Sequence, residues 1–308
     1  MPTEVWTAND LNNVRNNLAG DYIQMAHIDL GSWGNWTPIG HGSGWGYSEF
    51  LGSYAGNGHK IIDMSSVFAS HNYIGLFAYL GNGSEVSGLG FVNATVEGDY
   101  LSGALAGASE GTVSQCESGG SIKSNSWYAG GLIGAAWYNG SIANCYNKAS
   151  VDSPNATGGL IGFFDAPVTI TNCYSAGLVV GAGLSEPVGG LVGHTYDGVV
   201  TNSYYDSDVS GQSDTGKGEP RTTAEMTHPS ASNTYVSWDF ATIWKHDTDY
   251  TINAGYPYLF AVEPAFAVYA KIAAAWKSGP AWIKKDGTWK SVTDGWIKEG
   301  GVWKPIIP

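Results

Sequence analysis

The stretch Gly130-Gly131-Leu132-Ile133-Gly134, followed by Gly140-Ser141-Ile142-Ala143-Asn144-Cys145-Tyr146, decides the fold, because the chain repeats it on both sides. Its leucine recurs at steps of 29, 27, 28 and 31 residues, and these anchors are Leu76, Leu105, Leu132, Leu160 and Leu191. The second half recurs in phase, as Thr112–Cys116, Ile170–Tyr174 and Val200–Tyr204. A period of this length predicts stacked units that bury a continuous core only together.

Each repeat unit holds short apolar segments separated by polar turns with Asn or Gly. Three strands of about five residues per unit would form one coil of a parallel β-helix, with adjacent coils roughly 4.8 Å apart. A helical repeat is disfavoured, because each of the paired glycines would cost about 1 kcal/mol inside a helix. The pattern therefore predicts an all-β parallel solenoid.

The chain is expected to bend within the second segment of each unit. Ile142 and Cys145 have opposite strand parity, so both can face the core only if the backbone turns near Asn144. Asparagine tolerates a left-handed backbone and can bond to its neighbours along a stack. We therefore expect an asparagine ladder at this corner, made by Asn144, Asn172 and Asn202.

The three cysteines, Cys116, Cys145 and Cys173, also keep the repeat phase, at steps of 29 and 28 residues. The favoured interpretation is a stacked ladder of buried free thiols that fills one slot of the core. A zinc site would need a fourth ligand and closer spacing, such as Cys-x-x-Cys, and neither is present. We therefore expect no metal and no cofactor.

The 308 residues are 43% hydrophobic and only 13% charged, and they include 44 glycines. This hydrophobic content argues against disorder, and a polar but weakly charged surface suits an extracellular or particle-bound protein. The formal net charge of −13 argues against sequence-independent nucleic-acid binding. No apolar run is long enough for membrane insertion. Met1-Pro2-Thr3-Glu4 begins no secretory signal, so we expect either a leader missing from this chain or export within an assembled particle.

Four parts are expected along the chain. They are a cap with the first strand, the parallel β-helix, an irregular closure, and a small β module for attachment or oligomerisation: residues 1–30, 31–210, 211–264 and 265–308. A helix is expected at residues 7–18, because Leu11, Val14 and Leu18 have helical spacing and Thr7 can cap it. Such a helix would shield the first coil from solvent.

The last part has a repeat of its own, since Ala281–Lys290 recurs 14 residues later as Gly295–Lys304. Asp-Gly and Gly-Gly turns predict two β-hairpins there. Residues 271–308 carry a net charge of +4, against −17 over the rest. The tandem Trp-Lys endings resemble the C-termini of many bacteriophage tail and structural proteins. The residues expected to act in attachment or oligomerisation are Trp276, Trp282, Trp289, Trp296 and Trp303.

The Gly-Gly-Leu-Ile-Gly and Asn-Cys-Tyr units resemble the bacterial GLUG repeat, which occurs in large surface adhesins, filamentous haemagglutinin-like proteins and the non-catalytic part of immunoglobulin-cleaving peptidases. The flanking segments Tyr22–Leu30, Gly56–His59 and Tyr256–Leu259 resemble the flanks of that repeat as well. The resemblance covers roughly residues 7–260. It implies a right-handed β-helix, and it implies no chemistry.

No catalytic constellation stands out, so we expect no enzyme and no catalytic residue. The seven histidines form no His-Glu-x-x-His, and no Gly-x-Ser-x-Gly elbow is present. Glycan-cleaving β-helices use two or three acids on one face, but acids such as Glu97, Asp99 and Asp206 fall in different repeat phases. Asp206-Ser207-Asp208 begins like a calcium loop, yet Lys217 takes the twelfth position, where a bidentate Glu is needed.

Aromatic residues at the turns give the better binding hypothesis. Several rings along one edge could stack on sugars, with Asn and Ser supplying hydrogen bonds. The alternative is that they pack over coil corners or against a partner subunit. These candidates for glycan or receptor binding are Trp127, Tyr128, Trp137, Tyr138, Phe163, Phe164 and Tyr196. By contrast, Tyr146, Tyr174 and Tyr204 keep the repeat phase and are expected to form a structural stack.

These features together favour a non-enzymatic bacteriophage virion protein, such as a fibre, spike or decoration protein. Its expected partners are a host-surface glycan or receptor and, through residues 265–308, other virion proteins or copies of itself. A fragment of a bacterial cell-surface adhesin is the second hypothesis. The third is a glycan-degrading tailspike depolymerase, which would release oligosaccharides from host capsule.

Overall fold

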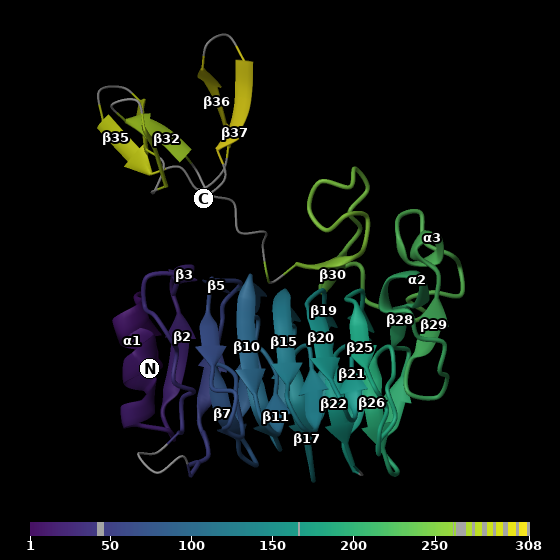
Figure 1. The fold of residues 1–308 in the computed structure, drawn as a ribbon. Coiled ribbons are helices and arrows are strands. Elements are labelled where there is room, and N and C mark those ends of the chain that lie inside the picture. The colour runs from purple at the N-terminus through teal and green to yellow at the C-terminus, as the bar shows by residue number, and fades with distance from the viewer. Residues whose placement is uncertain are drawn as a thin grey trace. The chain divides into compact units, whose positions relative to one another are not determined.

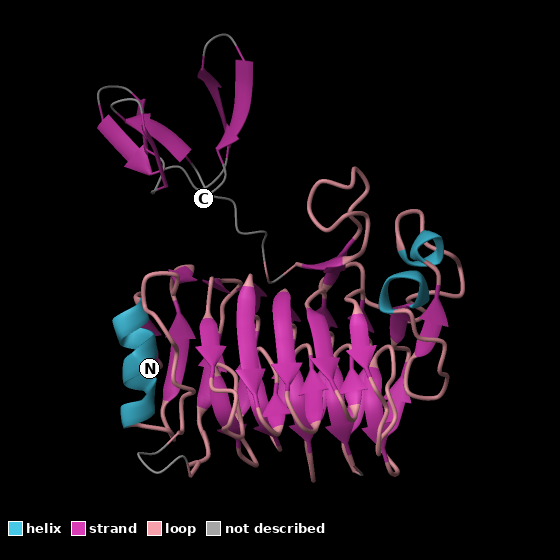
Figure 2. Ribbon diagram, viewed as in Figure 1, coloured by secondary structure: helices cyan, strands magenta, loops and turns pink. Residues whose placement is uncertain are grey.

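The chain forms a parallel β-helix, seen from the side in Figure 1 and coloured by secondary structure in Figure 2. The computed structural model describes residues 1–41, 46–165, 167–260 and 262, together with the backbone of six strands between residues 269 and 306. Its contacts divide into two units, Met1–Glu263 and Pro264–Pro308. None of the helices in this described part is long and apolar enough to cross a membrane.

Five parallel sheets, here numbered I to V, run along the solenoid. Sheet I contains β1 (Thr3–Val5), β2 (Asp21–Gln24), β4 (Ser53–Ala55), β8 (Glu85–Ser87), β13 (Thr112–Ser114), β18 (Ser141–Ala143), β23 (Thr169–Thr171) and β27 (Val199–Thr201). Sheet II contains β3 (Ile28–Asp29), β5 (Lys60–Ile62), β9 (Gly90–Val92), β14 (Glu117–Ser118), β19 (Tyr146–Asn147), β24 (Tyr174–Ser175), β28 (Tyr204–Asp206) and β29 (Glu219–Arg221).

The other three sheets are shorter. Sheet III contains β6 (Ser65–Val67), β10 (Ala94–Gly98), β15 (Gly120–Ser124), β20 (Ser150–Ser153) and β25 (Val179–Gly181). Sheet IV contains β11 (Leu101–Ser102), β16 (Tyr128–Gly130) and β21 (Thr157–Gly158). Sheet V contains β7 (Phe77–Leu80), β12 (Ala106–Ser109), β17 (Ile133–Ala136), β22 (Ile161–Phe164) and β26 (Val192–Thr195).

One regular coil passes through all five sheets, for example β12, β13, β14, β15 and β16, before β17 begins the next. The predicted fold class is confirmed, but the expectation of three strands of about five residues is wrong, because corners divide a regular coil into five shorter strands. In the less regular coils before the repeat, β4 and β5 likewise belong to different sheets, and each pairs with strands of neighbouring coils.

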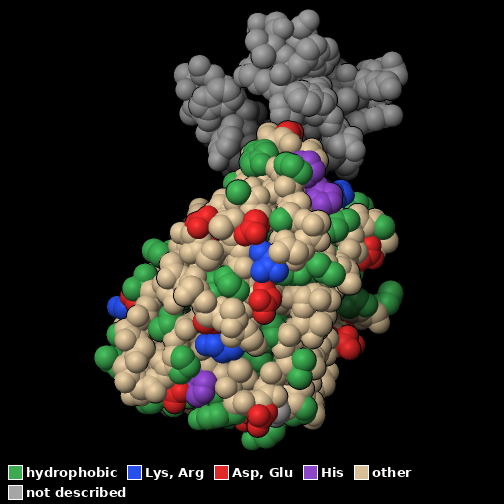
Figure 3. All heavy atoms as spheres, turned by 90° about the vertical axis from the view of Figure 1, so that its right-hand side faces the viewer, with side chains coloured by type: hydrophobic (Ala, Val, Ile, Leu, Met, Phe, Trp, Pro, Cys, Tyr) green, Lys and Arg blue, Asp and Glu red, His purple; other side chains and the backbone are tan. Residues whose placement is uncertain are grey.

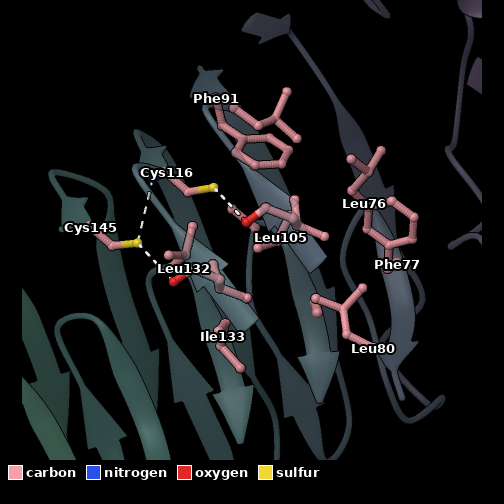
Figure 4. Packing of buried hydrophobic residues seen from close by; sticks show 14 of the residues in the cluster. Leu76, Phe77, Leu80, Phe91, Leu105, Cys116, Leu132, Ile133 and Cys145 are labelled. Atoms are coloured by element: carbon pink, nitrogen blue, oxygen red, sulfur yellow. Dashed lines mark hydrogen bonds between the residues drawn. The ribbon is translucent and has the colours of Figure 1, made fainter. Parts of the chain in front are cut away.

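The repeat leucines form the centre of the core, and all five are fully buried. The cysteine ladder is confirmed beside them. The Cys145 amide donates to the Cys173 thiol at 3.4 Å, and the Cys116 amide donates to the Cys145 thiol at 3.5 Å. All three thiols are free and buried, and burial raises the pKa of the Cys145 thiol. Figure 4 shows two of these cysteines facing the same interior as Leu76, Leu105 and Leu132.

The predicted asparagine corner lies between sheets I and II. Asn144, Asn172 and Asn202 have φ values of 54°, 53° and 46°, in the left-handed region. Gln115 takes the same place one coil earlier, with φ 51°. The corner reverses strand parity, so Ile142 and Cys145 both reach the core, as expected.

A short helix closes the N-terminal end of the solenoid, as predicted. α1 (Ala8–Asn13) begins with a capping box, in which the Thr7 hydroxyl accepts the Asp10 amide and the Asp10 carboxylate accepts the Thr7 amide. It ends earlier than predicted, in the 3-10 turn η1 (Val14–Asn16), because the asparagine-rich sequence has low helix propensity. Leu11 and Val14 are fully buried against the first coil.

The last glycine of each Gly-x-Leu-x-Gly phrase lets sheet IV pack closely on sheet V. A Cβ at Gly134 would lie 2.5 Å from the Gly107 carbonyl oxygen and 2.7 Å from the Ser102 amide nitrogen. A Cβ at Gly162 would lie 2.8 Å from the Ala129 amide nitrogen. These neighbours are backbone atoms, so no side-chain rotation could relieve the overlap.

After the last coil, residues 222–260, here called the return segment, lie along the outer face of sheet II. The segment includes α3 (Thr223–Met226), β30 (Trp244–Lys245) and β31 (Tyr258–Leu259). Its buried side chains share one cluster with the predicted tyrosine stack: Met226, Tyr235, Trp238, Trp244, Tyr256 and Leu259, with Tyr146, Tyr174 and Tyr204. Tyr146 and Tyr174 are stacked at 4.9 Å, whereas the Tyr204 ring packs against Tyr235 and Trp238, so the structural role is confirmed for all three and the stacking for the first two.

The C-terminal unit contains three antiparallel hairpins in its described backbone. β34 (Trp282–Lys285) pairs with β35 (Thr288–Ser291), and β36 (Gly295–Glu299) pairs with β37 (Val302–Ile306), as predicted. A further hairpin of β32 (Tyr269–Ile272) and β33 (Ala275–Ser278) was not expected from the sequence. The side chains of the five candidate tryptophans in this unit, and the predicted turns at 286–287 and 300–301, lie outside the described part.

Candidate functional site

A row of aromatic side chains lies on the outer face of sheet V. In this sheet Tyr79, Ala108, Ala135, Phe163 and His194 are register partners, one from each coil. The alanines leave space above the middle strands. Rings from the neighbouring turns and from sheet IV pack there against Leu101, Ala135 and Phe163: Tyr73, Tyr100, Tyr128 and Trp137.

We call the whole set the aromatic band: Tyr47, Tyr73, Tyr79, Tyr100, Trp127, Tyr128, Trp137, Tyr138, Phe163, His194 and Tyr196. Its rings follow one another from the first coils to the last. Tyr79 lies 6.0 Å from Trp137, Tyr128 lies 5.0 Å from Phe163, and Phe163 lies 5.7 Å from Tyr196. The stacking of coils therefore turns aromatic residues scattered through the sequence into a continuous surface.

Most of the aromatic candidates from the sequence belong to this band. Tyr138 and Tyr196 are 63% and 65% exposed, and Trp127, Tyr128 and Trp137 are half-buried. Phe163 is 6% exposed and packs beneath the more exposed rings of the band. Phe164 is a correction, because it is fully buried in the core. Successive strand residues point to opposite faces, so Phe163 and Phe164 cannot both face solvent.

One end of the band forms a hollow of about 320 Å³, lined by four rings and two carboxylates: Tyr47, Glu49, Tyr79, Glu110, Trp137 and Tyr138. The rings of Tyr47 and Tyr79 are stacked at 4.8 Å with an interplanar angle of 7°. Tyr138 is placed by the turn after β17, where it has φ 52° and the Gly140 amide donates to the Trp137 carbonyl oxygen at 3.2 Å.

The hydrogen bond between Tyr79 and Glu110 orders the floor of this hollow. The Tyr79 hydroxyl donates to a Glu110 carboxylate oxygen. Burial, that hydrogen bond and the negative charges of Glu110 and Glu49 raise the pKa of Tyr79, and burial raises the pKa of Tyr73 to about 12. Both phenols therefore stay neutral at physiological pH, and the negative charge of the hollow comes from the two carboxylates.

The sequence reasoning missed four residues of this hollow: Tyr47, Glu49, Tyr79 and Glu110. Tyr79 could have been found from the repeat, because Phe77-Ala78-Tyr79-Leu80 aligns with Ile133-Gly134-Ala135-Ala136. This alignment places Tyr79 at the same position of the coil as Ala135, shortly before the turn aromatics Trp137 and Tyr138. Glu110 likewise follows β12 as Trp137 follows β17. Tyr47 and Glu49 precede the regular repeat, so the period gave no information about them.

The opposite end of the band combines rings with a histidine and an acid. His194 packs 4.7 Å from Tyr196, and its Nδ1 forms an ion pair with Glu186 when the ring is protonated. Burial and the neighbouring Tyr100, Glu186 and Tyr196 raise the pKa of Tyr128 to about 12. Tyr196 projects into solvent at this end, as Tyr138 does at the hollow.

A second hollow of about 270 Å³ lies at the last coil, between Thr201–Tyr204 and Glu219–Arg221. Arg221 lies over the Tyr204 ring at 5.2 Å, and its guanidinium donates to the carbonyl oxygens of Pro220 and Asn233. Figure 3 views this end of the solenoid, where hydrophobic and charged side chains are scattered over the surface and no charge of one sign gathers into a large patch. The guanidinium is engaged by the fold, so this hollow is the weaker candidate.

The segment that begins like a calcium loop is structural. α2 (Ser207–Ser210) follows β28, and Asp206 caps it by accepting the Val209 amide at 3.0 Å. Asp208 accepts the Thr223 amide at 3.0 Å. Among the acids considered for catalysis, Glu97 pairs with Lys123 at 3.2 Å, and Asp99 accepts the Ser126 hydroxyl. Within the described residues no group of three metal-ligating side chains is present.

Comparison with known proteins identifies the repeat and the fold. A family described as the GLUG motif matches residues 125–152. The chain is 40% identical over 116 residues to a protein of Evansella cellulosilytica named "Putative Gly-rich membrane protein", a match that covers 35% of this chain and 13% of that protein. It is 31% identical over 144 residues to halomucin of Haloquadratum walsbyi, covering 43% of this chain and 2% of halomucin.

A solved structure resembles most of this chain. It is the crystal structure titled a putative immunoglobulin A1 protease from Bacteroides ovatus, with a TM-score of 0.60 and 20% sequence identity. The match covers 85% of this chain and 93% of that chain. At this identity the similarity shows the fold alone. The chain thus carries a GLUG motif on a parallel β-helix and spans only a small part of the curated relatives it matches.

Proposed function

We propose that this chain is a non-enzymatic, surface-displayed β-helix that binds a glycan or another receptor through the aromatic band. The observation that carries the proposal is the band itself. Apart from Tyr79 and Phe163, its rings remain partly accessible along the outer face of sheet V, whereas the tyrosine stack on sheet II is covered by the return segment. Aromatic faces with adjacent polar groups are suited to stacking on sugar rings.

The location rests on the relatives. One is named as a Gly-rich membrane protein and the other as halomucin, and both are much longer than this chain. The solenoid would then be one segment of a bacterial cell-surface protein of the adhesin class. The low content of charged residues, 13%, is consistent with exposure outside the cell.

The binding proposal predicts that Trp127→Ala combined with Tyr196→Ala weakens glycan binding by about tenfold or more. Each ring contributes roughly 0.5–1.5 kcal/mol beyond its buried area, and 1.4 kcal/mol corresponds to a factor of ten. The measurement is binding of the full chain to an array of microbial polysaccharides, followed by titration of the best ligand. Tyr250→Ala serves as a control, because Tyr250 is 52% exposed and lies in the return segment.

Equal binding by the double variant and the control would contradict the role of the band. The same incubation tests the depolymerase alternative, because an enzyme would release oligosaccharides with new reducing ends. Such release by the wild-type chain, abolished by acid-to-amide changes, would replace the binding proposal with a hydrolytic function.

A bacteriophage virion protein is the second candidate, suggested by the resemblance of the tandem Trp-Lys endings in the hairpins β34–β35 and β36–β37 to phage tail proteins. This candidate predicts that deleting residues 265–308 leaves the β-sheet circular dichroism spectrum in place and abolishes incorporation into particles or self-association. Sedimentation of the full and truncated chains with purified particles is the measurement. If both chains cosediment equally, residues 265–308 are not the attachment module.

A further inference from the structure

The hollow at Tyr79 has a charge that its surroundings do not balance. Among the residues that the structure describes, its lining contains two carboxylates, Glu49 and Glu110, and no Lys or Arg. Within the residues that the structure describes, neither carboxylate takes part in an ion pair. Glu49 is exposed and Glu110 is half-buried, where it accepts the Tyr79 hydroxyl.

The aromatic rings add to this negative potential. The face of an aromatic ring is negative because of its quadrupole, and a cation within about 6 Å of the ring centre is attracted by roughly 0.5–2 kcal/mol. Tyr47 is stacked on Tyr79, which is only 4% exposed, so the rings open to a cation are Tyr47, Trp137 and Tyr138, which is 63% exposed at the rim. Rings and carboxylates therefore favour the same kind of ligand, whereas either feature alone would be ambiguous.

We propose that this hollow binds an organic ammonium group, either a quaternary ammonium or the free amine of an amino sugar. The proposal deepens the proposed function by assigning a ligand class to one end of the aromatic band, and it rests on that function. A neutral sugar would gain only the stacking term, and an acidic polysaccharide would be repelled by Glu49 and Glu110.

The size of the hollow agrees with a single head group. Small-molecule sites usually have volumes of about 300–1,000 Å³, and the hollow has about 320 Å³. A longer polymer would place one ammonium group here and continue along the band, past Trp137 toward Tyr128.

The test is isothermal titration calorimetry of the full chain with two matched pairs of ligands. Choline is compared with 3,3-dimethylbutan-1-ol, which has the same shape without the charge, and glucosamine is compared with N-acetylglucosamine. We expect the charged member of at least one pair to bind at least tenfold more tightly, with affinity falling as salt is raised. The pair that shows the difference distinguishes a quaternary ammonium from an amino sugar.

Variants locate the site. Glu49→Gln with Glu110→Gln should weaken binding of the charged ligand at least tenfold while leaving the weak binding of the neutral one unchanged. Trp137→Ala should weaken both. Asp152→Asn is the control, because it removes one exposed carboxylate from β20 in sheet III. Unchanged circular dichroism and thermal midpoint verify that each variant is folded.

Equal affinity within both pairs, no binding of either charged ligand, or loss of binding in the control variant would overturn the proposal. These outcomes differ from failure of the proposed function. Polysaccharide binding that depends on Trp127 and Tyr196 but ignores ligand charge keeps the band as a receptor surface and removes the ammonium site alone.

Discussion

Replacing Gly107, Gly134, Gly162 and Gly193 together by alanine is expected to abolish folding of the solenoid. At Gly107, Gly134 and Gly193 an added Cβ would lie 2.3–2.5 Å from the nearest backbone atom. At Gly162 this distance would be 2.6 Å. Inserting a methyl group into a well-packed region costs about 1–3 kcal/mol. Four such insertions approach the total stability of a domain, roughly 5–15 kcal/mol.

The single variant Gly134→Ala should remain folded and show a lower midpoint in urea, by the equivalent of about 1–3 kcal/mol. Gly46→Ala is the matched control, because no heavy atom of the described residues, its chain neighbours aside, lies within 4 Å of the added Cβ. It should change stability by less than about 0.5 kcal/mol. A quadruple variant with the wild-type circular dichroism spectrum and urea midpoint would show that sheets IV and V do not depend on these glycines.

The repeat made much of the fold predictable. A side chain that returns every 27–31 residues must fill the same position in successive coils, so Leu132, Cys145 and Asn144 could be assigned before the structure was known. The parity argument also placed the corner at Asn144, because a strand alternates its faces and only a turn lets Ile142 and Cys145 share one. The left-handed φ of 54° at Asn144 confirms that step.

The number of strands per coil could not be predicted in the same way. Apolar residues mark what faces the core, but sheet IV faces the glycine row of sheet V and not the leucines. Its strands β11, β16 and β21 have only two or three residues each. Such short strands show no alternation of apolar and polar residues, so the sequence pattern does not distinguish them from the neighbouring strands.

The candidate site was predictable only in part. Trp137 and Tyr138 attracted attention as consecutive turn aromatics, whereas Tyr79 looked like one more apolar residue of a strand. Glu110 belongs to the hollow because it accepts a hydrogen bond from the Tyr79 hydroxyl, which lies in the preceding coil. A contact between coils joins residues about 30 positions apart. The sequence gives the repeat phase of such residues but does not show which of them form hydrogen bonds with each other.

Replacing Glu117 by glutamine is expected to destabilise the solenoid by about 3–5 kcal/mol, the usual cost of leaving one buried charge without its partner. Glu117 is 5% exposed and Lys60 is 8% exposed, and the two form an ion pair across the strand between them. In that strand, Gly90 is the register partner of both Lys60 and Glu117. Because Gly90 has no side chain, the Lys60 side chain can extend over it to the Glu117 carboxylate. The Tyr146 hydroxyl donates to the same carboxylate. Urea denaturation followed by circular dichroism measures the loss.

A double variant separates the ion pair from the packing around it. Replacing Lys60 by Met and Glu117 by Leu removes both charges and keeps similar volume, so most of the stability lost in Glu117→Gln should return. Glu97→Gln is the control, since its partner Lys123 is 45% exposed and such surface pairs contribute at most about 1 kcal/mol. A double variant as unstable as the single one would show that the Tyr146 hydrogen bond, and not the unpaired Lys60 charge, accounts for the effect. Sheet II would then depend on a neutral contact with the tyrosine stack beneath the return segment.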